Sequence, residues 1–139
     1  MPSSKVYVLD ANALIRYVKN GVGADKVEGL MRRVVKREAQ LLISVVNWGE
    51  ALYVMARQAG FDHAAADMKA LRSLIETVPT DEAVTEAAAS LKFRYKLGYA
   101  DSFAAALALR TKATLVTADP EFAKLGKQLK VLALPRHAA

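Results

Sequence analysis

Apolar residues recur along the chain with two alternating spacings, and this alternation predicts the order of its secondary structure. Short apolar runs bounded by polar or turn residues are typical of buried strands, whereas apolar positions three or four residues apart are typical of amphipathic helices. The strand-like runs cover residues 5–9, 40–44, 75–78, 114–117 and 131–134. Helix-like segments fill the intervals, so the pattern predicts strands joined by helices.

Capping residues and glycines predict where the helices begin and end. The first helix starts near Ala13 and runs out at Gly21 and Gly23. Asp25 with Glu28 resembles a capping box, and it predicts the start of a basic helix that reaches about residue 38.

The remaining helices follow from the same signals. The helix over residues 45–59 places Trp48, Leu52, Met55 and Ala56 on one face and stops at Gly60. Asp62 is expected to cap a helix over residues 62–74, and Thr80 or Asp81 an Ala-rich helix that ends at Gly98. Another helix is predicted over residues 100–111, and a turn at Asp119-Pro120 leads into a short helix to residue 125.

Strands separated by helices need crossover connections, which produce a parallel sheet covered by helices on both faces. The predicted class is therefore α/β, a three-layer α/β/α sandwich with a mostly parallel sheet. No linker, repeat or low-complexity tract interrupts the pattern, so residues 1–139 are expected to form a single domain. In such folds the carboxyl ends of the strands and the amino ends of the helices meet at one edge, where ligands bind.

Composition indicates a reducing compartment and a polyanionic partner. The chain has no cysteine, which excludes disulfides, thiolate zinc sites and thiol nucleophiles and fits the cytosol. No signal-peptide core precedes the first strand, and no apolar run approaches the roughly 18 residues of a membrane span, so we expect a cytoplasmic protein. The 20 Lys and Arg against 14 Asp and Glu give a charge of +6. That balance suits nucleic-acid binding and plain solubility equally well.

Four carboxylates map to the ligand-binding edge of the predicted sheet. Asp10 closes the first strand, and Asp119 follows the strand over residues 114–117. Glu50 lies in the second turn of the helix after the second strand, and Asp101 in the first turn of the helix over residues 100–111. Glu50 and Asp101 are also isolated acids in apolar surroundings, so neither belongs to a solvated charge stripe.

Each acid also has a purely structural interpretation. Asp10, Asp101 and Asp119 could each cap a helix, and Pro120 strengthens that interpretation for Asp119. Glu50 lies too deep in its helix to cap it, and its neighbours are expected to be buried. Four such positions at one edge favour a shared site over four separate structural roles.

Carboxylates that meet at one site need a cation. Two of them about 4 Å apart repel by roughly 4 kcal/mol at an effective dielectric of about 20. Because cysteine and paired histidines are absent, oxygen ligands select a hard ion such as Mg²⁺ or Mn²⁺. Such ions activate water and neutralise charge on a phosphate, so an acidic pocket in a basic protein predicts a metal-dependent nuclease.

Four segments, VLDANALI, ISVVNWGEALY, YADSFAAALA and LVTADPEF, resemble the successive acidic motifs of PIN domains. The resemblance spans about residues 5–134, and length and spacing are most similar to the bacterial VapC toxins of toxin–antitoxin pairs. It implies a sheet of four or five parallel strands and Mg²⁺- or Mn²⁺-dependent ribonuclease activity on RNA. It also implies a homodimer and a cognate antitoxin that covers the active site.

The same resemblance assigns roles to individual residues. It implies that the catalytic, metal-binding acids are Asp10, Glu50, Asp101 and Asp119. Asn12 and Thr117 match polar positions that support the site, and Ser44 is a weaker candidate of the same kind. Ala11 stands where many relatives carry Ser or Thr, which puts one minor supporting contact in doubt and no ligand.

Two other α/β classes with acidic pockets fit the sequence poorly. A receiver domain needs an acceptor Asp after its third strand, where this chain has Thr77-Val78-Pro79, and a Lys after its fifth, where Pro135 follows Leu134. An aspartyl-nucleophile phosphatase needs Asp-x-Asp after the first strand, whereas residues 10–12 supply one acid. A catalytically silent PIN-like RNA-binding module and a housekeeping RNA-processing nuclease stay open as alternatives.

Residues outside the acidic motifs have simpler expected roles. His63 and His137 match no metal or triad pattern and are expected to be solvated. Trp48 and Tyr53 are expected in the core or at a dimer contact. The basic residues expected to flank the pocket and bind single-stranded RNA are Arg16, Lys96 and Arg110.

Overall fold

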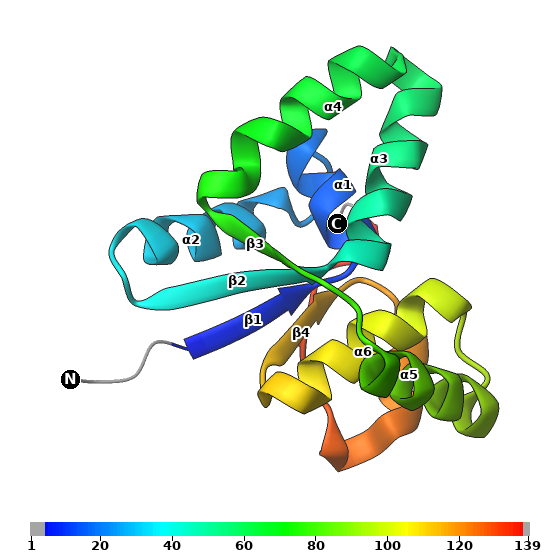
Figure 1. The fold of residues 1–139 in the computed structure, drawn as a ribbon. Helices are drawn as coiled ribbons and strands as arrows, with labels where there is room; N and C mark the ends of the chain where they lie inside the picture. The colour runs from blue at the N-terminus through cyan, green and yellow to red at the C-terminus, as the bar shows by residue number, and fades with distance from the viewer. Residues whose placement is uncertain (1–4, 138–139) are drawn as a thin grey trace.

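The computed structural model describes residues 5–137 and contains a five-stranded sheet in the order β3-β2-β1-β4-β5 (Figure 1). Each strand is parallel to its neighbours, which confirms the α/β class. Residues 1–4, where no signal-peptide core is predicted, lie outside the described residues. The strands are β1 (Lys5–Leu9), β2 (Ala39–Ser44), β3 (Ile75–Val78), β4 (Thr114–Thr117) and β5 (Lys130–Ala133).

Helices connect the strands in the predicted order. They are α1 (Ala11–Val18), α2 (Ala24–Val35), α3 (Val45–Ala59), α4 (Phe61–Lys69), α5 (Glu82–Tyr95) and α6 (Tyr99–Thr111). Two 3₁₀ segments, η1 (Ala70–Ser73) and η2 (Pro120–Gln128), complete the described chain.

Alternate strand residues face two separate apolar cores, as the pleat of a strand requires. In β1, Tyr7 and Leu9 pack among α1 to α4, whereas Val8 packs with α5 and α6. In β4, Val116 packs in the core with α1 to α4, and Leu115 packs in the core with α5 and α6. Figure 1 shows α1 to α4 on one side of the sheet and α5 and α6 on the other. The molecule is therefore the predicted three-layer sandwich.

The order of the strands fixes where a ligand site can form. From β1 the chain adds β2 and β3 on one side and then returns to the other side for β4 and β5. The carboxyl ends of β1 and β4 consequently meet where the strand order reverses. In open parallel sheets this reversal leaves a crevice in which ligands bind.

Two predicted helix caps are wrong because glycines fix those helix ends. Gly23 takes φ +87°, a left-handed conformation that suits glycine, and it is the N-cap of α2. Asp25 consequently falls inside the first turn. Gly60, with φ +89°, ends α3 and also precedes α4, so Asp62 falls inside the first turn of α4.

Several boundaries also differ from the predicted ones. α5 ends at Tyr95 because Lys96 takes a left-handed φ of +56°. Residues 70–73 form η1, and β5 begins one residue earlier than expected. The segment after Asp119 is a 3₁₀ helix that reaches Gln128 across a kink at Gly126.

No helix of residues 5–137 combines the length and the apolarity needed to cross a bilayer.

Replacing the observed cap of α5 should destabilise the protein more than replacing the cap that the sequence wrongly predicts. Asp81 Oδ1 accepts a hydrogen bond from the Val84 N–H at 2.8 Å, whereas Asp25 caps no helix. We expect Asp81→Ala to lower Tm by a few degrees and Asp25→Ala to change it little. Thermal unfolding followed by circular dichroism measures both variants. Equal losses would contradict the assignment of the caps.

Candidate metal centre

Asp10 lies at the junction of β1, β4 and α1. It follows β1 directly and is only 3% exposed. Its Oδ1 accepts a hydrogen bond from the Ala13 N–H at 2.8 Å, so the carboxylate caps α1. Its Oδ2 accepts a hydrogen bond from the hydroxyl of Thr117, the last residue of β4. The two donors fix the orientation of both carboxylate oxygens.

Thr117 also contacts the second strand-end acid, Asp119. The Thr117 side chain is buried, and its Oγ1 accepts a hydrogen bond from the Asp119 N–H at 2.9 Å. Asp119 Oδ1 accepts the Glu121 N–H at 2.9 Å, and Pro120 stands at the first position of η2. Asp119 therefore caps η2, and a single hydroxyl separates it from Asp10.

Asp101 reaches the same edge from the first turn of α6. Gly98 is the N-cap of that helix, so the interpretation of Asp101 as a cap is wrong. A Cβ on Gly98 would lie 3.3 Å from Asp101 Oδ2, and the glycine therefore leaves room for the carboxylate. Among residues 5–137 no group donates a hydrogen bond to the Asp101 side chain.

Glu50 lies in the second turn of α3, and its side chain is exposed. This differs from the buried surroundings expected from its neighbours. Trp48 and Ala51 are indeed buried, but successive helix residues point about 100° apart, so Glu50 faces the opening at the sheet edge. The carboxylate therefore approaches Asp10 and Asp101 from the solvent side.

A buried amide links the two helices that carry Glu50 and Asp101. Asn47, in the first turn of α3, is fully buried, and its Nδ2 donates a hydrogen bond to the Ala100 carbonyl of α6 at 3.0 Å. Its Oδ1 has no hydrogen-bond partner within residues 5–137. Sequence reasoning missed this residue, although an amide inside the apolar run before Trp48 was an available signal.

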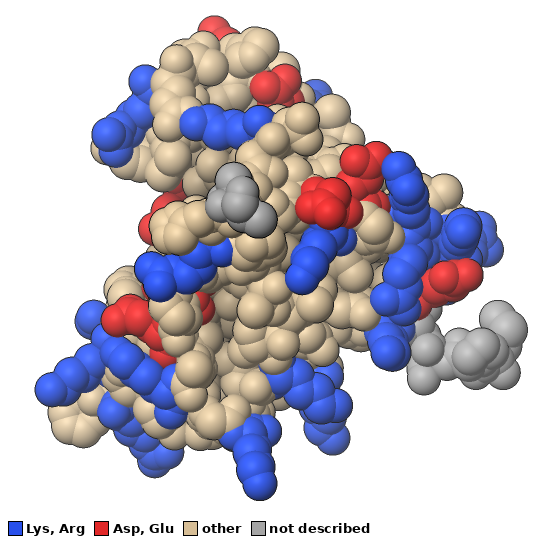
Figure 2. Space-filling model, turned by 180° about the vertical axis from the view of Figure 1, so that it is seen from behind, with Lys and Arg blue, Asp and Glu red and all other residues tan. Residues whose placement is uncertain are grey.

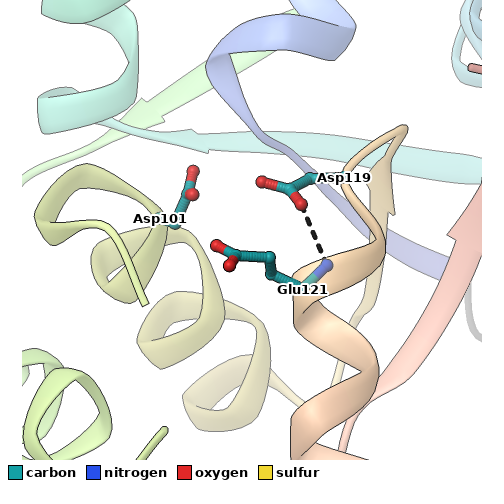
Figure 3. Close-up of side chains that lie close together, drawn as sticks. All are labelled: Asp101, Asp119 and Glu121. Carbon is teal, nitrogen blue, oxygen red and sulfur yellow. Dashed lines mark hydrogen bonds between the residues drawn. The ribbon is translucent and has the colours of Figure 1, made fainter. Parts of the chain in front are cut away.

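Glu121 is a fifth carboxylate, which sequence reasoning also missed. Asp101, Asp119 and Glu121 each offer an oxygen, and these three oxygens lie within 4.8 Å of one another. Figure 3 shows the three side chains pointing toward one another from α6 and from the start of η2. The signal was present in the motif LVTADPEF, because Asp119 and Glu121 are two residues apart in one turn.

All four predicted acids line one cleft of about 550 Å³. A cleft of about 420 Å³ along β2 and β3 is lined by a single carboxylate, Glu76, so it offers no second acidic ligand for a cation. On the face seen in Figure 2, Lys and Arg are spread widely, and small groups of Asp and Glu lie between them. The polar lining of the 550 Å³ cleft consists of Asp10, Asn12, Arg16, Glu50, Asp101, Asp119 and Arg136.

Burial, together with neighbouring negative charges, raises the pKa of two of the acids in the cleft. Burial raises the pKa of Asp10 to about 6, although the hydrogen bonds from Thr117 and Ala13 oppose the shift. Burial also raises the pKa of Asp101 to about 7, and the negative charges of Asp10 and Asp119 add to that shift. Without a cation, the fold therefore disfavours full ionisation of the cluster.

The donor set fits a hard divalent cation. Every candidate ligand is a carboxylate oxygen, and Mg²⁺ and Mn²⁺ prefer such ligands. His63 lies on α4, exposed and 3.4 Å from Asp67, so it supplies no nitrogen ligand to the cleft. The raised pKa values point the same way, because a cation would offset the repulsion that causes part of them.

Three other predicted contributors do not line the cleft. Ser44 caps α3, and its Oγ accepts the Val46 N–H at 3.2 Å. Arg110 lies at the far end of α6 and pairs with Asp81 at 3.0 Å, so its expected place beside the pocket is wrong. Lys96 is exposed at the end of α5.

A comparison with protein families decides the family. The family model of the PIN domain matches residues 7–128, which contain all four predicted acids and Glu121. The chain belongs to the PIN domain family. The resemblance predicted from the four motifs is therefore confirmed. No curated protein sequence matches the chain.

Several solved structures share the fold of this PIN domain. A chain of the DNA-bound VapBC complex of Salmonella typhimurium has a TM-score of 0.74 at 18% identity, covering 93% of this chain and 98% of that one. A chain of VapBC2 from Rickettsia felis, bound to a promoter DNA fragment, has a TM-score of 0.73 at 19% identity, covering 93% of this chain and 98% of that one. Mycobacterium tuberculosis VapC20, a Sarcin-Ricin loop cleaving toxin, has a TM-score of 0.67 at 17% identity, covering 86% of this chain and 95% of that one. At these identities the likeness establishes the shared fold.

The raised pKa values predict how the stability of the metal-free PIN domain depends on pH. Asp10 and Asp101 have folded-state pKa values of about 6 and about 7, above the ordinary 3.8. Between about pH 4 and pH 7 the folded state therefore binds more protons than the unfolded state. The free energy of unfolding consequently decreases as pH rises through this range. In EDTA we expect Tm to fall between about pH 4 and pH 7.

Asp101→Asn tests this pH dependence directly. The Asp101 side chain caps no helix, so the substitution removes the charge without removing a cap. It should reduce the fall in Tm between the two pH limits and raise Tm at neutral pH. Calorimetry in EDTA across the window tests both statements. A lower Tm than wild type at neutral pH would mean that the Asp101 carboxylate stabilises the metal-free fold.

Proposed function

We propose that this PIN domain is a Mg²⁺- or Mn²⁺-dependent ribonuclease and the toxin of a toxin–antitoxin pair. The observation that carries the proposal is the convergence of Asp10, Glu50, Asp101 and Asp119 in one cleft of a basic protein. Separate helix caps would not need Glu50 and Asp101, which cap nothing. A shared cation site explains all four positions.

The metal ligands in this proposal are Asp10, Glu50, Asp101 and Asp119, with Glu121 beside them. A divalent ion held by these residues would activate water and neutralise charge on a phosphate during in-line displacement. Thr117 and Ala13 hold the Asp10 carboxylate in one orientation, so its oxygens are arranged before any ligand arrives. Asn12 is exposed in the cleft wall, where its amide can contact substrate.

The raised pKa of Asp101 gives that carboxylate a second role. At neutral pH and without a cation it holds a proton for part of the time, because its pKa is about 7. Asp101 would have to lose this proton to bind a cation, so metal affinity should increase with pH.

Charge and the structural relatives support RNA and an antitoxin as partners. The net charge of +6 favours a polyanion, and the related VapC20 of Mycobacterium tuberculosis is described as cleaving the Sarcin-Ricin loop. Related chains from Salmonella typhimurium and Rickettsia felis occur in VapBC complexes. An inhibitor could insert Arg or Lys into the acidic cleft and compete with the metal.

Other features of the proposal come from the sequence and the family resemblance. They are a homodimer, a cytosolic location and a single domain over residues 1–139. Tyr53 on α3 is 61% exposed, beneath Arg57 at 5.5 Å, and is available for a dimer contact. Trp48 is buried, which agrees with its expected place in the core. A silent RNA-binding module and a housekeeping nuclease are the alternatives that the experiments below distinguish.

RNA cleavage should require a divalent metal and all four acids. We expect purified protein to cleave RNA with Mg²⁺ or Mn²⁺ and to stop in EDTA. Asp10→Asn, Glu50→Gln, Asp101→Asn and Asp119→Asn should each lower turnover by roughly 100-fold or more, and pairs should be non-additive because the ligands act as one unit. Gel analysis of labelled RNA measures these rates.

The matched control is Asp62→Asn, an exposed acid on α4 outside the cleft. It should retain wild-type turnover. RNA binding without cleavage under any metal would identify a silent module. Full activity in EDTA would exclude the proposed metal mechanism.

Expression of the chain alone in a bacterium should arrest growth through RNA cleavage. We expect arrest by the wild type, none by Asp10→Asn, and relief by a co-expressed antitoxin, whose complex should melt higher than the free chain. Growth curves after induction measure the effect. Equal arrest by both proteins would point to toxicity without cleavage, and no arrest by either would favour a housekeeping nuclease.

A further inference from the structure

The segment after β5 completes the wall of the carboxylate cleft. We call residues 134–136, which are Leu134, Pro135 and Arg136, the post-β5 segment. Arg136 lines the same cleft as the four acids. The match to the PIN family model ends at residue 128, so this part of the wall lies outside the matched region.

Arg16 ties this segment to α1. One guanidinium nitrogen, Nη1, donates hydrogen bonds to the Val22 carbonyl at 3.1 Å and to the Pro135 carbonyl, and Nη2 donates to the Arg136 carbonyl at 3.2 Å. Asp10 caps the same helix. The helix that begins at the acid therefore also holds the segment that carries Arg136.

Three further contacts hold the post-β5 segment and the end of β5. The Leu134 N–H donates to the Thr117 carbonyl at 2.8 Å, and the Leu134 side chain is buried in the core. A Cβ on Gly23 would lie 3.2 Å from Leu134 Cβ, and the glycine also needs its positive φ. Lys26 Nζ donates to the Ala133 carbonyl at 3.4 Å. The backbone that carries Arg136 is thus fixed at the rim.

The two arginines of the cleft differ in what their guanidinium groups contact. Arg16 donates to three carbonyls and is half-buried, so its charge is committed to the protein. Arg136 is exposed, and no carboxylate within residues 5–137 lies within ion-pair distance of it. Arg136 is consequently a cation available at the edge of an acidic site.

We propose that Arg136 binds a backbone phosphate of single-stranded RNA beside the cleavage site, and that Arg16 is the positioning residue that holds it there. The proposal rests on the proposed function. A guanidinium suits this role because its donors match two phosphate oxygens. Bound RNA would place one phosphate against the carboxylate cleft and the next against Arg136.

The direct test compares Arg136→Ala and Arg136→Lys with wild type in cleavage of a short single-stranded RNA with Mg²⁺ or Mn²⁺. We expect Arg136→Ala to raise KM by roughly 10-fold with kcat and the metal requirement nearly unchanged, because a charged hydrogen bond to bound substrate is lost. Arg136→Lys should recover part of the loss. In Arg136→Ala the slope of log Kd against log salt concentration should be smaller by about 0.7, which corresponds to one neutralised phosphate.

Arg32→Ala is the matched control, because it removes the same charge from the exposed side chain of a residue on α2 outside the cleft. Its KM should stay at the wild-type value. Equal KM changes in Arg32→Ala and Arg136→Ala would overturn the proposal, since net charge alone would then account for them. A fall in kcat at constant KM in Arg136→Ala would overturn it too.

Arg16 is tested with a double-mutant cycle. Arg16→Met should raise KM in the wild-type background but not further in the Arg136→Ala background, because it acts through Arg136. If Arg16 has a purely structural role, Arg16→Met should lower Tm in both backgrounds, and the effects of the two substitutions on KM should be additive. That result would overturn the positioning role.

Failure of the proposed function is distinguishable from failure of this inference. If wild-type protein binds RNA without cleaving it under any metal, the nuclease proposal fails, and Kd for Arg136→Ala against Arg32→Ala still decides the inference. A weaker Kd for Arg136→Ala alone supports it, and equal values overturn it.

Discussion

The hydrogen bond from the Thr117 hydroxyl to Asp10 joins the carboxyl ends of β1 and β4, and the arrangement of the cleft depends on it. The same hydroxyl accepts the Asp119 N–H, and the Thr117 carbonyl accepts the Leu134 N–H. One buried residue thus orients two acids and anchors the post-β5 segment. Buried polar groups are stable only when they are hydrogen-bonded, so these contacts leave few alternative arrangements.

The cleft works against the stability of the metal-free protein. Asp10 is almost completely buried, and its pKa and that of Asp101 are raised because burial and neighbouring carboxylates disfavour their charged forms. Asp10 and Asp119 offset part of this cost by capping α1 and η2. The same carboxylates therefore serve the fold and the candidate chemistry. A site in which like charges meet is typical of a functional constraint rather than of optimal stability.

Helix packing sets the relative positions of the other two acids. Glu50 and Asp101 come from α3 and α6, which lie on opposite faces of the sheet and converge where β1 and β4 end. Asn47 joins the first turns of these helices through the Ala100 carbonyl. The distance between the two acids consequently depends on a buried amide as well as on apolar packing, because the amide must keep its hydrogen bond when the helices pack.

The sequence by itself determined the elements, the parallel α/β class and the edge to which Asp10, Glu50, Asp101 and Asp119 map. Apolar spacing is a local property, and crossover connections constrain the topology that it permits. The helix starts at Gly23 and Gly60 were mispredicted, because side-chain capping signals compete with a backbone that must turn through positive φ.

Tertiary structure alone decided the contacts between residues distant in the chain. Glu121 joins Asp101, Arg110 lies away from the cleft, and Arg16 holds the backbone of Arg136. Partners separated by up to 120 positions leave no periodic trace in a single sequence. Their contacts depend on how the layers pack, and the packed layers decide which of the charged side chains face the same cleft.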